Sequence, residues 1–176
     1  MSRIPVSYVM RPDGHCGFRA IAHAIFKCQD DWNDIRTSLL KHLESYGKDD
    51  ANPYVLVAGT NFGELKNRLE CQAAEGSPRL QWFHDTWHGQ LVADLYNVYL
   101  VSAEKVGGTK VLIRPPTGFT SVNAVLGAIQ PGNPLIRMLF DRNCEHFDAL
   151  EFSMGARALL ADRANSTIML SSVGGG

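Results

Sequence analysis

Apolar residues recur every three or four positions through the first half of the chain, which is the spacing of amphipathic helices. The clearest run is Phe18, Ile21, Ala22 and Ile25. Helix-capping polar residues and a terminating glycine divide this half into segments. Three helices are expected: from Cys16 to about Cys28, from a cap at Asp30 or Asp31 to Gly47, and from Thr60 or Asn61 through Leu65, Leu69 and Ala73.

The second half of the chain changes to short apolar runs that are typical of β-strands. Helices followed by a small, mostly antiparallel sheet indicate a compact α/β or α+β fold, with the sheet packed between helices. Residues 1–164 are expected to form one domain, and residues 165–176 a flexible tail. The expected elements are a loop over 76–89, helices over 90–96 and 121–130, strands over 97–101, 110–114, 136–140 and 147–152, and a turn at Gly107-Gly108, after an N-terminal arm over 1–12.

Composition and charge narrow the class of protein. The chain has 176 residues, of which 45% are hydrophobic and 20% charged, as in ordinary globular proteins. Its net charge of −1 provides no basic surface for nucleic acid or for an anionic membrane. The apolar runs are too short to span a bilayer, and residues 1–5 lack the apolar core of a signal peptide. We therefore expect a cytoplasmic monomer.

Candidate chemistry begins with the cysteines, which are far apart and form no Cys-x-x-Cys pair, so free thiols are expected. Cys28 and Cys71 lie on apolar faces of expected helices, where packing is their predicted role. Cys16 opens a helix, where unsatisfied N–H groups and the helix dipole favour a thiolate. Far downstream stands His146, with Asp148 two residues later. These three residues are a candidate nucleophile, base and orienting acid.

Three motifs occur in order along the chain. The first is Asp13-Gly14-His15-Cys16-Gly17-Phe18-Arg19-Ala20, which matches Asp-Gly-x-Cys-x-x-Arg-Ala. The second is Trp87-His88-Gly89-Gln90-Leu91 followed by Asn97-Val98-Tyr99-Leu100-Val101, and the third is His146-Phe147-Asp148. The ordered set resembles the ovarian tumour (OTU) family of cysteine proteases, which remove ubiquitin and related modifiers.

The resemblance implies a deubiquitinase that cleaves isopeptide or peptide bonds after the terminal Gly-Gly of ubiquitin, polyubiquitin or a ubiquitin-like modifier. Cys16 would be the nucleophile, ion-paired with a protonated His146 that lowers its pKa. Asp148 would orient the imidazole, with Asn143 as a backup. Asp13 would shape the oxyanion loop, whose backbone N–H groups run from Asp13 to Cys16. The chemistry needs no metal or cofactor.

Five residues are candidate substrate contacts. Gly14 and Gly17 are small enough to let an extended substrate backbone approach the nucleophile. Trp87 and His88 are candidates for the walls of a channel that holds the modifier tail. His15 stands where the family usually has Asn or Asp, and what it contributes beside Cys16 stays open.

Other interpretations also fit the sequence. The pairs His15-Cys16 and Cys144-x-His146 could imitate a zinc site. The short divergent chain, which ends Gly174-Gly175-Gly176, is also compatible with a viral protease that processes a polyprotein, a role that can coexist with deubiquitination. A non-catalytic ubiquitin-binding module ranks last, because Cys16 and His146 are both present. The divergence favours a viral or other pathogen source acting in the host cytosol.

Overall fold

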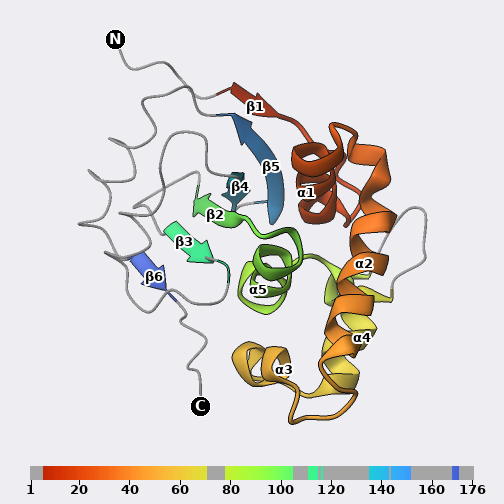
Figure 1. The fold of residues 1–176 in the computed structure, drawn as a ribbon. Coiled ribbons are helices and arrows are strands. Elements are labelled where there is room, and N and C mark those ends of the chain that lie inside the picture. Colours follow the sequence, from red (N-terminus) through yellow and green to blue (C-terminus); the bar gives the residue numbers. More distant parts are fainter. Residues whose placement is uncertain are drawn as a thin grey trace.

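The structure is a computed structural model that describes residues 6–70, 78–104, 111–114, 116, 135–142, 144–151 and 168–170. Helices dominate the first half of the chain and strands the second (Figure 1). The described α-helices are α1 (Cys16–Phe26), α2 (Trp32–Ser45), α3 (Pro53–Ala58), α4 (Phe62–Leu69) and α5 (Asp85–Tyr96), and two short 3-10 helices cover Gln29–Asp31 and Arg79–Gln81. The described strands are β1 (Val6–Tyr8), β2 (Tyr99–Glu104), β3 (Val111–Arg114), β4 (Leu135–Asp141), β5 (His146–Glu151) and β6 (Ile168–Leu170).

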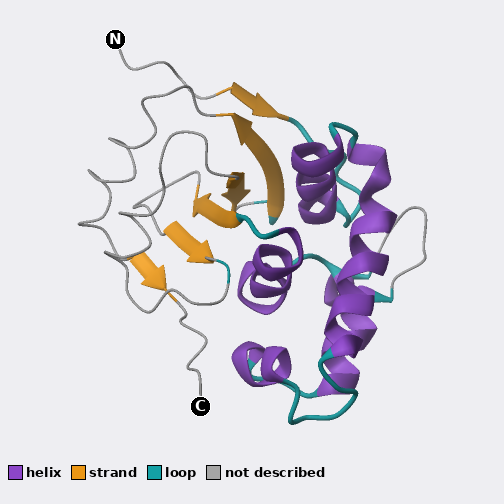
Figure 2. Ribbon diagram, in the orientation of Figure 1, coloured by secondary structure: helices purple, strands orange, loops and turns teal. Residues whose placement is uncertain are grey.

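The strands form one mixed sheet in the order β1-β5-β4-β2-β3-β6. β1 with β5, β4 with β5, and β2 with β3 run antiparallel, whereas β2 with β4 and β3 with β6 run parallel. The described helices gather on one side of this sheet, as Figure 2 shows. The structure therefore confirms the expected compact α/β fold with a mostly antiparallel sheet. It differs from the expectation in that the described helices cover one side of the sheet and do not enclose it on both sides.

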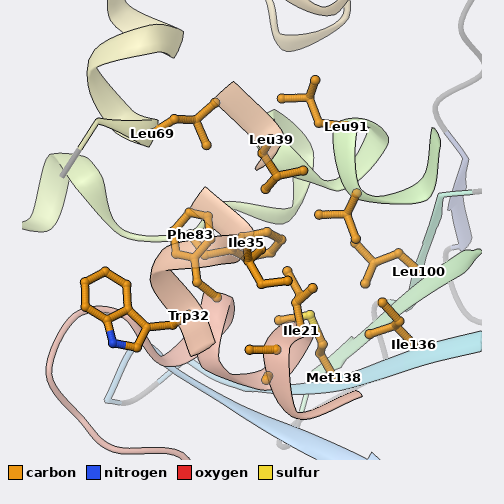
Figure 3. Close-up of a cluster of buried hydrophobic side chains, with 14 of the residues drawn as sticks. Ile21, Trp32, Ile35, Leu39, Leu69, Phe83, Leu91, Leu100, Ile136 and Met138 are labelled. Carbon is orange, nitrogen blue, oxygen red and sulfur yellow. The ribbon is translucent and has the colours of Figure 1, made fainter. Parts of the chain in front are cut away.

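The core lies between these helices and the sheet, and its side chains come from both layers (Figure 3). Leu100 of β2 and Met138 of β4 meet helical residues such as Ile21 and Ile35, all of them at most 1% exposed. Burial of such side chains is the main favourable contribution to folding. This packing holds the start of α1 beside β5, which places residues from the two ends of the sequence together.

The helix predictions are confirmed in type and approximate position for α1, α2 and α4. Asn61 caps α4 by accepting a hydrogen bond from the Glu64 N–H at 2.8 Å. The sequence interpretation missed α3, although Asn52 and Pro53 carry the signal of a capped helix with proline at its first position. No helix in the described part of the chain is long and apolar enough to cross a lipid bilayer.

Several boundaries differ from the prediction. α5 begins at Asp85, inside the segment that was expected to be loop. Asn97, which was expected in a strand, ends this helix in the left-handed conformation with φ 50°. β6 lies within the range expected to be a flexible tail, which corrects that expectation for its three residues. The expected turn at Gly107-Gly108 and the helix over 121–130 lie outside the described residues.

Candidate active site

The turn before α1 is shaped by Asp13 and Gly14. Gly14 adopts φ 82°, a left-handed conformation that side chains other than glycine rarely tolerate. The Asp13 carboxylate accepts a hydrogen bond from the His15 N–H at 3.0 Å. The His15 carbonyl in turn accepts from the Arg19 N–H at 2.8 Å, which closes the first turn of the helix. The conformation of Gly14 and these hydrogen bonds therefore fix the backbone immediately before Cys16.

A buried arginine holds this turn from behind. Arg19 bonds Asp13 through Nε at 3.0 Å and through its terminal nitrogen at 2.6 Å, and it also reaches Asp30 at 3.1 Å. Burial raises the pKa of the Asp13 carboxyl, but the hydrogen bonds from Arg19 and the His15 N–H and the nearby positive charge outweigh it. The pKa of Asp13 therefore lies below its usual value. These contacts support Asp13 as the residue that shapes the loop.

Cys16 is the first residue of α1 and is only 6% exposed. Its Sγ accepts a hydrogen bond from the Phe147 N–H at 3.4 Å. Burial is the largest effect on the thiol and raises its pKa, and the carboxylates of Asp13 and Asp148 raise it further. The N–H groups of Phe147 and Gly17 lower the pKa, but by less. The expectation of a low-pKa thiol is therefore corrected: burial holds the pKa of Cys16 above its usual value.

His146 and Asp148 form a pair at the start of β5. They are two residues apart in a strand, so both side chains lie on the same face, while Phe147 between them points into the core. His146 Nε2 lies 2.9 Å from Asp148 Oδ1. Because a carboxylate only accepts hydrogen bonds, Nε2 carries the proton. The other ring nitrogen, Nδ1, is then the basic atom of the imidazole.

The N-terminal arm completes this pair. The Met10 N–H donates to the same Asp148 Oδ1 at 3.0 Å, although the two residues are 138 positions apart. β1 pairs with β5, and Tyr8 of β1 lies opposite Ala149 of β5. This pairing brings the amide of Met10 to the carboxylate. Residues Val6, Tyr8 and Met10 alternate in the sequence, but nothing there indicated that the Met10 amide would orient an acid.

The backbone of the nucleophile turn offers fewer oxyanion donors than expected. The N–H of His15 is engaged by Asp13, so it is not available to a substrate oxygen. The N–H of Cys16 lies in the first turn of α1, where helical N–H groups have no acceptor within the helix. This group is therefore the donor that best fits a developing oxyanion beside Sγ.

Three of the five candidate substrate contacts have structural roles instead. His15 and His88 are both 0% exposed, which corrects the expectation that they face a substrate. The pKa of His88 lies well below its usual value because of burial and nearby positive charge, so its ring is uncharged. A Cβ at Gly17 would lie 2.3 Å from the Cβ of Phe83, so this glycine makes room for Phe83 rather than for substrate.

The remaining candidate residues differ in their burial and contacts. Gly14 is buried in the turn, and Trp87 is half-buried, with the Arg68 guanidinium 3.7 Å above its ring. Asn143, the backup orienter, lies outside the described residues. Cys28 is exposed, not packed as expected, and Cys144 is also exposed.

A zinc site finds no support in the described residues. The His15 ring is stacked on Trp32 with centroids 3.6 Å apart, and its Nδ1 contacts Arg36. One of its two possible ligand atoms is therefore already engaged by Arg36. Among the residues the structure describes, no three His, Cys, Asp or Glu side chains gather into a metal-binding set.

Comparison with solved structures identifies the fold. The OTUD1 OTU domain matches with a TM-score of 0.60 and 14% identity, over 84% of this chain and 86% of that chain. The chain has the OTU fold. The viral OTU protease of Dera Ghazi Khan virus matches with a TM-score of 0.58 and 11% identity, covering 85% of this chain and 81% of its own.

The Hazara virus OTU bound to ubiquitin shares the same fold at a TM-score of 0.55 and 16% identity, over 84% of this chain and 80% of that chain. No protein-family model and no curated protein matches the sequence. At these identities the likeness shows the OTU fold alone. The roles of individual residues therefore depend on the geometry described above.

Proposed function

We propose that the protein is a thiol-dependent deubiquitinase, which hydrolyses the bond after the terminal Gly-Gly of ubiquitin or a ubiquitin-like modifier. The observation that carries the proposal is the contact between Cys16 Sγ and the Phe147 N–H, because Phe147 directly follows His146. A nucleophile from the start of α1 and a base held by an acid at the start of β5 are thus neighbours. The OTU fold, shared with a viral domain bound to ubiquitin, supports the choice of substrate.

The first half of the reaction forms a thioester. His146 Nδ1 takes the proton from Cys16 Sγ as the sulfur attacks the carbonyl carbon of the terminal glycine. The Cys16 N–H stabilises the negative charge that develops on the carbonyl oxygen. The imidazolium then gives its proton to the lysine nitrogen as the C–N bond breaks, and the amine leaves.

The second half releases the modifier. His146 takes a proton from water, whose oxygen attacks the thioester carbonyl, and the proton returns to sulfur as the C–S bond breaks. Throughout, Asp148 holds Nε2–H and stabilises the imidazolium. The raised pKa of Cys16 is consistent with this order of reaction steps, because His146 then acts as a general base on a neutral thiol.

The test uses ubiquitin that carries a C-terminal electrophile, together with probes built on ubiquitin-like modifiers. The protein should form a covalent adduct through Cys16, located by peptide mass spectrometry. Cys16→Ala should abolish the adduct, and His146→Ala should slow its formation by at least about 10³-fold. Cys144→Ala removes an exposed thiol two residues before His146 and should react like the wild type. No Cys16-dependent adduct with any probe would refute the proposal.

A further inference from the structure

His15, directly before the nucleophile, is held through its backbone and through its side chain. Its N–H donates to Asp13 and its carbonyl accepts from Arg19, so the chain is fixed on both sides of the residue. Its ring stacks on Trp32 with an interplanar angle of 17° and is fully buried. His15 is therefore fixed both through its backbone and through its ring, directly before Cys16.

Arg36 of α2 is the polar partner of that ring. Its terminal nitrogen lies 3.1 Å from His15 Nδ1, and the whole side chain is only 1% exposed. Because a guanidinium only donates, Nδ1 of His15 accepts, and the ring proton is on Nε2. The Arg36 guanidinium also lies 3.8 Å from the centre of the Phe18 ring. His15 is therefore held as a neutral acceptor in one orientation.

The same guanidinium also binds backbone carbonyls of two other segments. It donates to the carbonyl of Gln81 at 2.6 Å and to the carbonyl of Arg68 at 2.7 Å. Gln81 lies two residues before Phe83, which packs directly against Gly17 and also makes an edge contact with the Phe147 ring at 5.5 Å. One buried arginine thus connects the nucleophile turn with the segment that packs on both sides of Cys16.

We propose that His15 and Arg36 are positioning residues for the hydrolysis, which keep the sulfur and the N–H of Cys16 aligned with His146. Neither residue touches the substrate, and both act through the backbone of the nucleophile turn. The inference rests on the proposed function for its reaction, but the alignment of Cys16 is a property of the protein without substrate. Misplacement of a reacting group by about 1 Å can lower a rate about 100-fold. Loss of a buried contact next to the nucleophile can therefore lower the rate of hydrolysis strongly.

Two substitutions at His15 separate its hydrogen bond from its stacking. In Asn, Oδ1 is as many bonds from Cβ as Nδ1 is in His, so His15→Asn keeps an acceptor for Arg36 and loses the ring stacked on Trp32. His15→Phe keeps a stacked ring and loses the acceptor. The proposal expects His15→Phe to lower kcat on a ubiquitin substrate by about 10- to 100-fold with KM within twofold. His15→Asn should keep kcat within about threefold of the wild type.

A control measures what loss of stability alone does. Tyr54→Phe removes a half-buried hydroxyl that bonds His42 and Asp94, each at 2.8 Å, in a cluster of α2, α3 and α5 away from Cys16. This variant should unfold at a lower temperature with kcat unchanged. Arg36→Lys keeps the charge but replaces a forked group that bonds three acceptors, so it should lower kcat as His15→Phe does. If Arg36→Lys does not fold, the pair of His15 variants still decides the question.

A readout without ubiquitin keeps the proposal separate from the choice of substrate. Alkylation of Cys16 by iodoacetamide, followed by peptide mass spectrometry, measures the thiol directly. His15→Phe should shift the pH dependence of this reaction toward that of a free thiol, and His15→Asn should not. The proposal is overturned if His15→Phe is folded and keeps both kcat and the alkylation profile, or if both His15 variants lose kcat equally. If the wild type does not turn over ubiquitin substrates, only the deubiquitinase assignment is refuted.

Discussion

The two halves of the candidate site are held in different ways. The nucleophile side, at the start of α1, is fixed by buried charged groups: Arg19 on Asp13, and Arg36 on His15. The base side is held by strand pairing and by two hydrogen bonds to one carboxylate oxygen, while its ion pairs lie at the surface. The side chains of His146 and Asp148 are 15% and 16% exposed; on the nucleophile side, Arg19 is 4% exposed and its partner Asp13 is 16% exposed. The nucleophile side is thus fixed by many contacts and the base side by few.

The largest expected effect is on catalysis at the base side. Asp148→Ala removes the acceptor of His146 Nε2 and should lower kcat by about 10²- to 10⁴-fold, because the ring loses its orientation and tautomer. Asp148→Asn keeps an oxygen that accepts from both the imidazole and the Met10 N–H, so it should stay within about tenfold of the wild type. Steady-state kinetics on a ubiquitin substrate measures both. Equal activity of Asp148→Ala and the wild type would remove Asp148 from the mechanism.

The next effect is on stability at the nucleophile side. Asp13→Ala leaves Arg19 buried without its closest partner and should lower the free energy of unfolding by about 3 kcal/mol. Asp13→Asn keeps an acceptor for the His15 N–H and should lose less. Urea denaturation measures both variants. A loss below about 1 kcal/mol for Asp13→Ala would mean that the nucleophile side is no more firmly held than the base side.

A smaller stability effect tests the packing behind the nucleophile. Gly17→Ala forces a methyl group into Phe83 and should destabilise the fold by about 1–3 kcal/mol. Gly63→Ala is the matched control, because a Cβ at this α4 position would lie 3.4 Å from its nearest neighbour, Asn61 Oδ1. The control should be neutral or slightly stabilising, since alanine favours helices. Equal melting temperatures for the two variants would contradict the close contact with Phe83.

The pH dependence of Cys16 reactivity compares the buried thiol with a free one. Burial raises the pKa of Cys16, so less thiolate is present at neutral pH, and the alkylation rate should rise about tenfold for each pH unit below that pKa. The rise should continue at pH values where N-acetylcysteine has already reached its plateau. A rate that stays flat from pH 5 to pH 8 would instead indicate a preformed thiolate–imidazolium pair.

The smallest effect is expected from the surface contacts of the base side. Arg79 and Glu145 form an ion pair between the segment before α5 and the loop that precedes His146, and their side chains are 71% and 40% exposed. Such pairs contribute less than about 1 kcal/mol to stability. Arg79→Ala should therefore change the melting temperature little, and salt should weaken what remains. A large loss would show that the base side is held more firmly than its burial indicates.

The sequence predicted the parts of the molecule that follow local rules. Helical spacing located α1, α2 and α4, and the resemblance to OTU proteases, now supported by the fold, selected Cys16, His146 and Asp148 as candidates. What it could not provide was long-range packing. The Met10 amide, Arg36 and Phe83 join the site through contacts between distant segments that no local pattern encodes. Burial of a polar ring also depends on neighbours elsewhere in the sequence, so the sequence alone does not distinguish the buried His15 and His88 from substrate contacts.

One further consequence concerns the order in which the protein is made. Cys16 and Phe147 are 131 positions apart, and Met10 and Asp148 are 138 apart. A chain emerging from the ribosome therefore presents Cys16 long before His146 and Asp148 have been synthesised. Contacts of such long range also form late in folding, because closing long loops is unfavourable. The candidate site can therefore assemble only when β5 has been synthesised and inserted between β1 and β4.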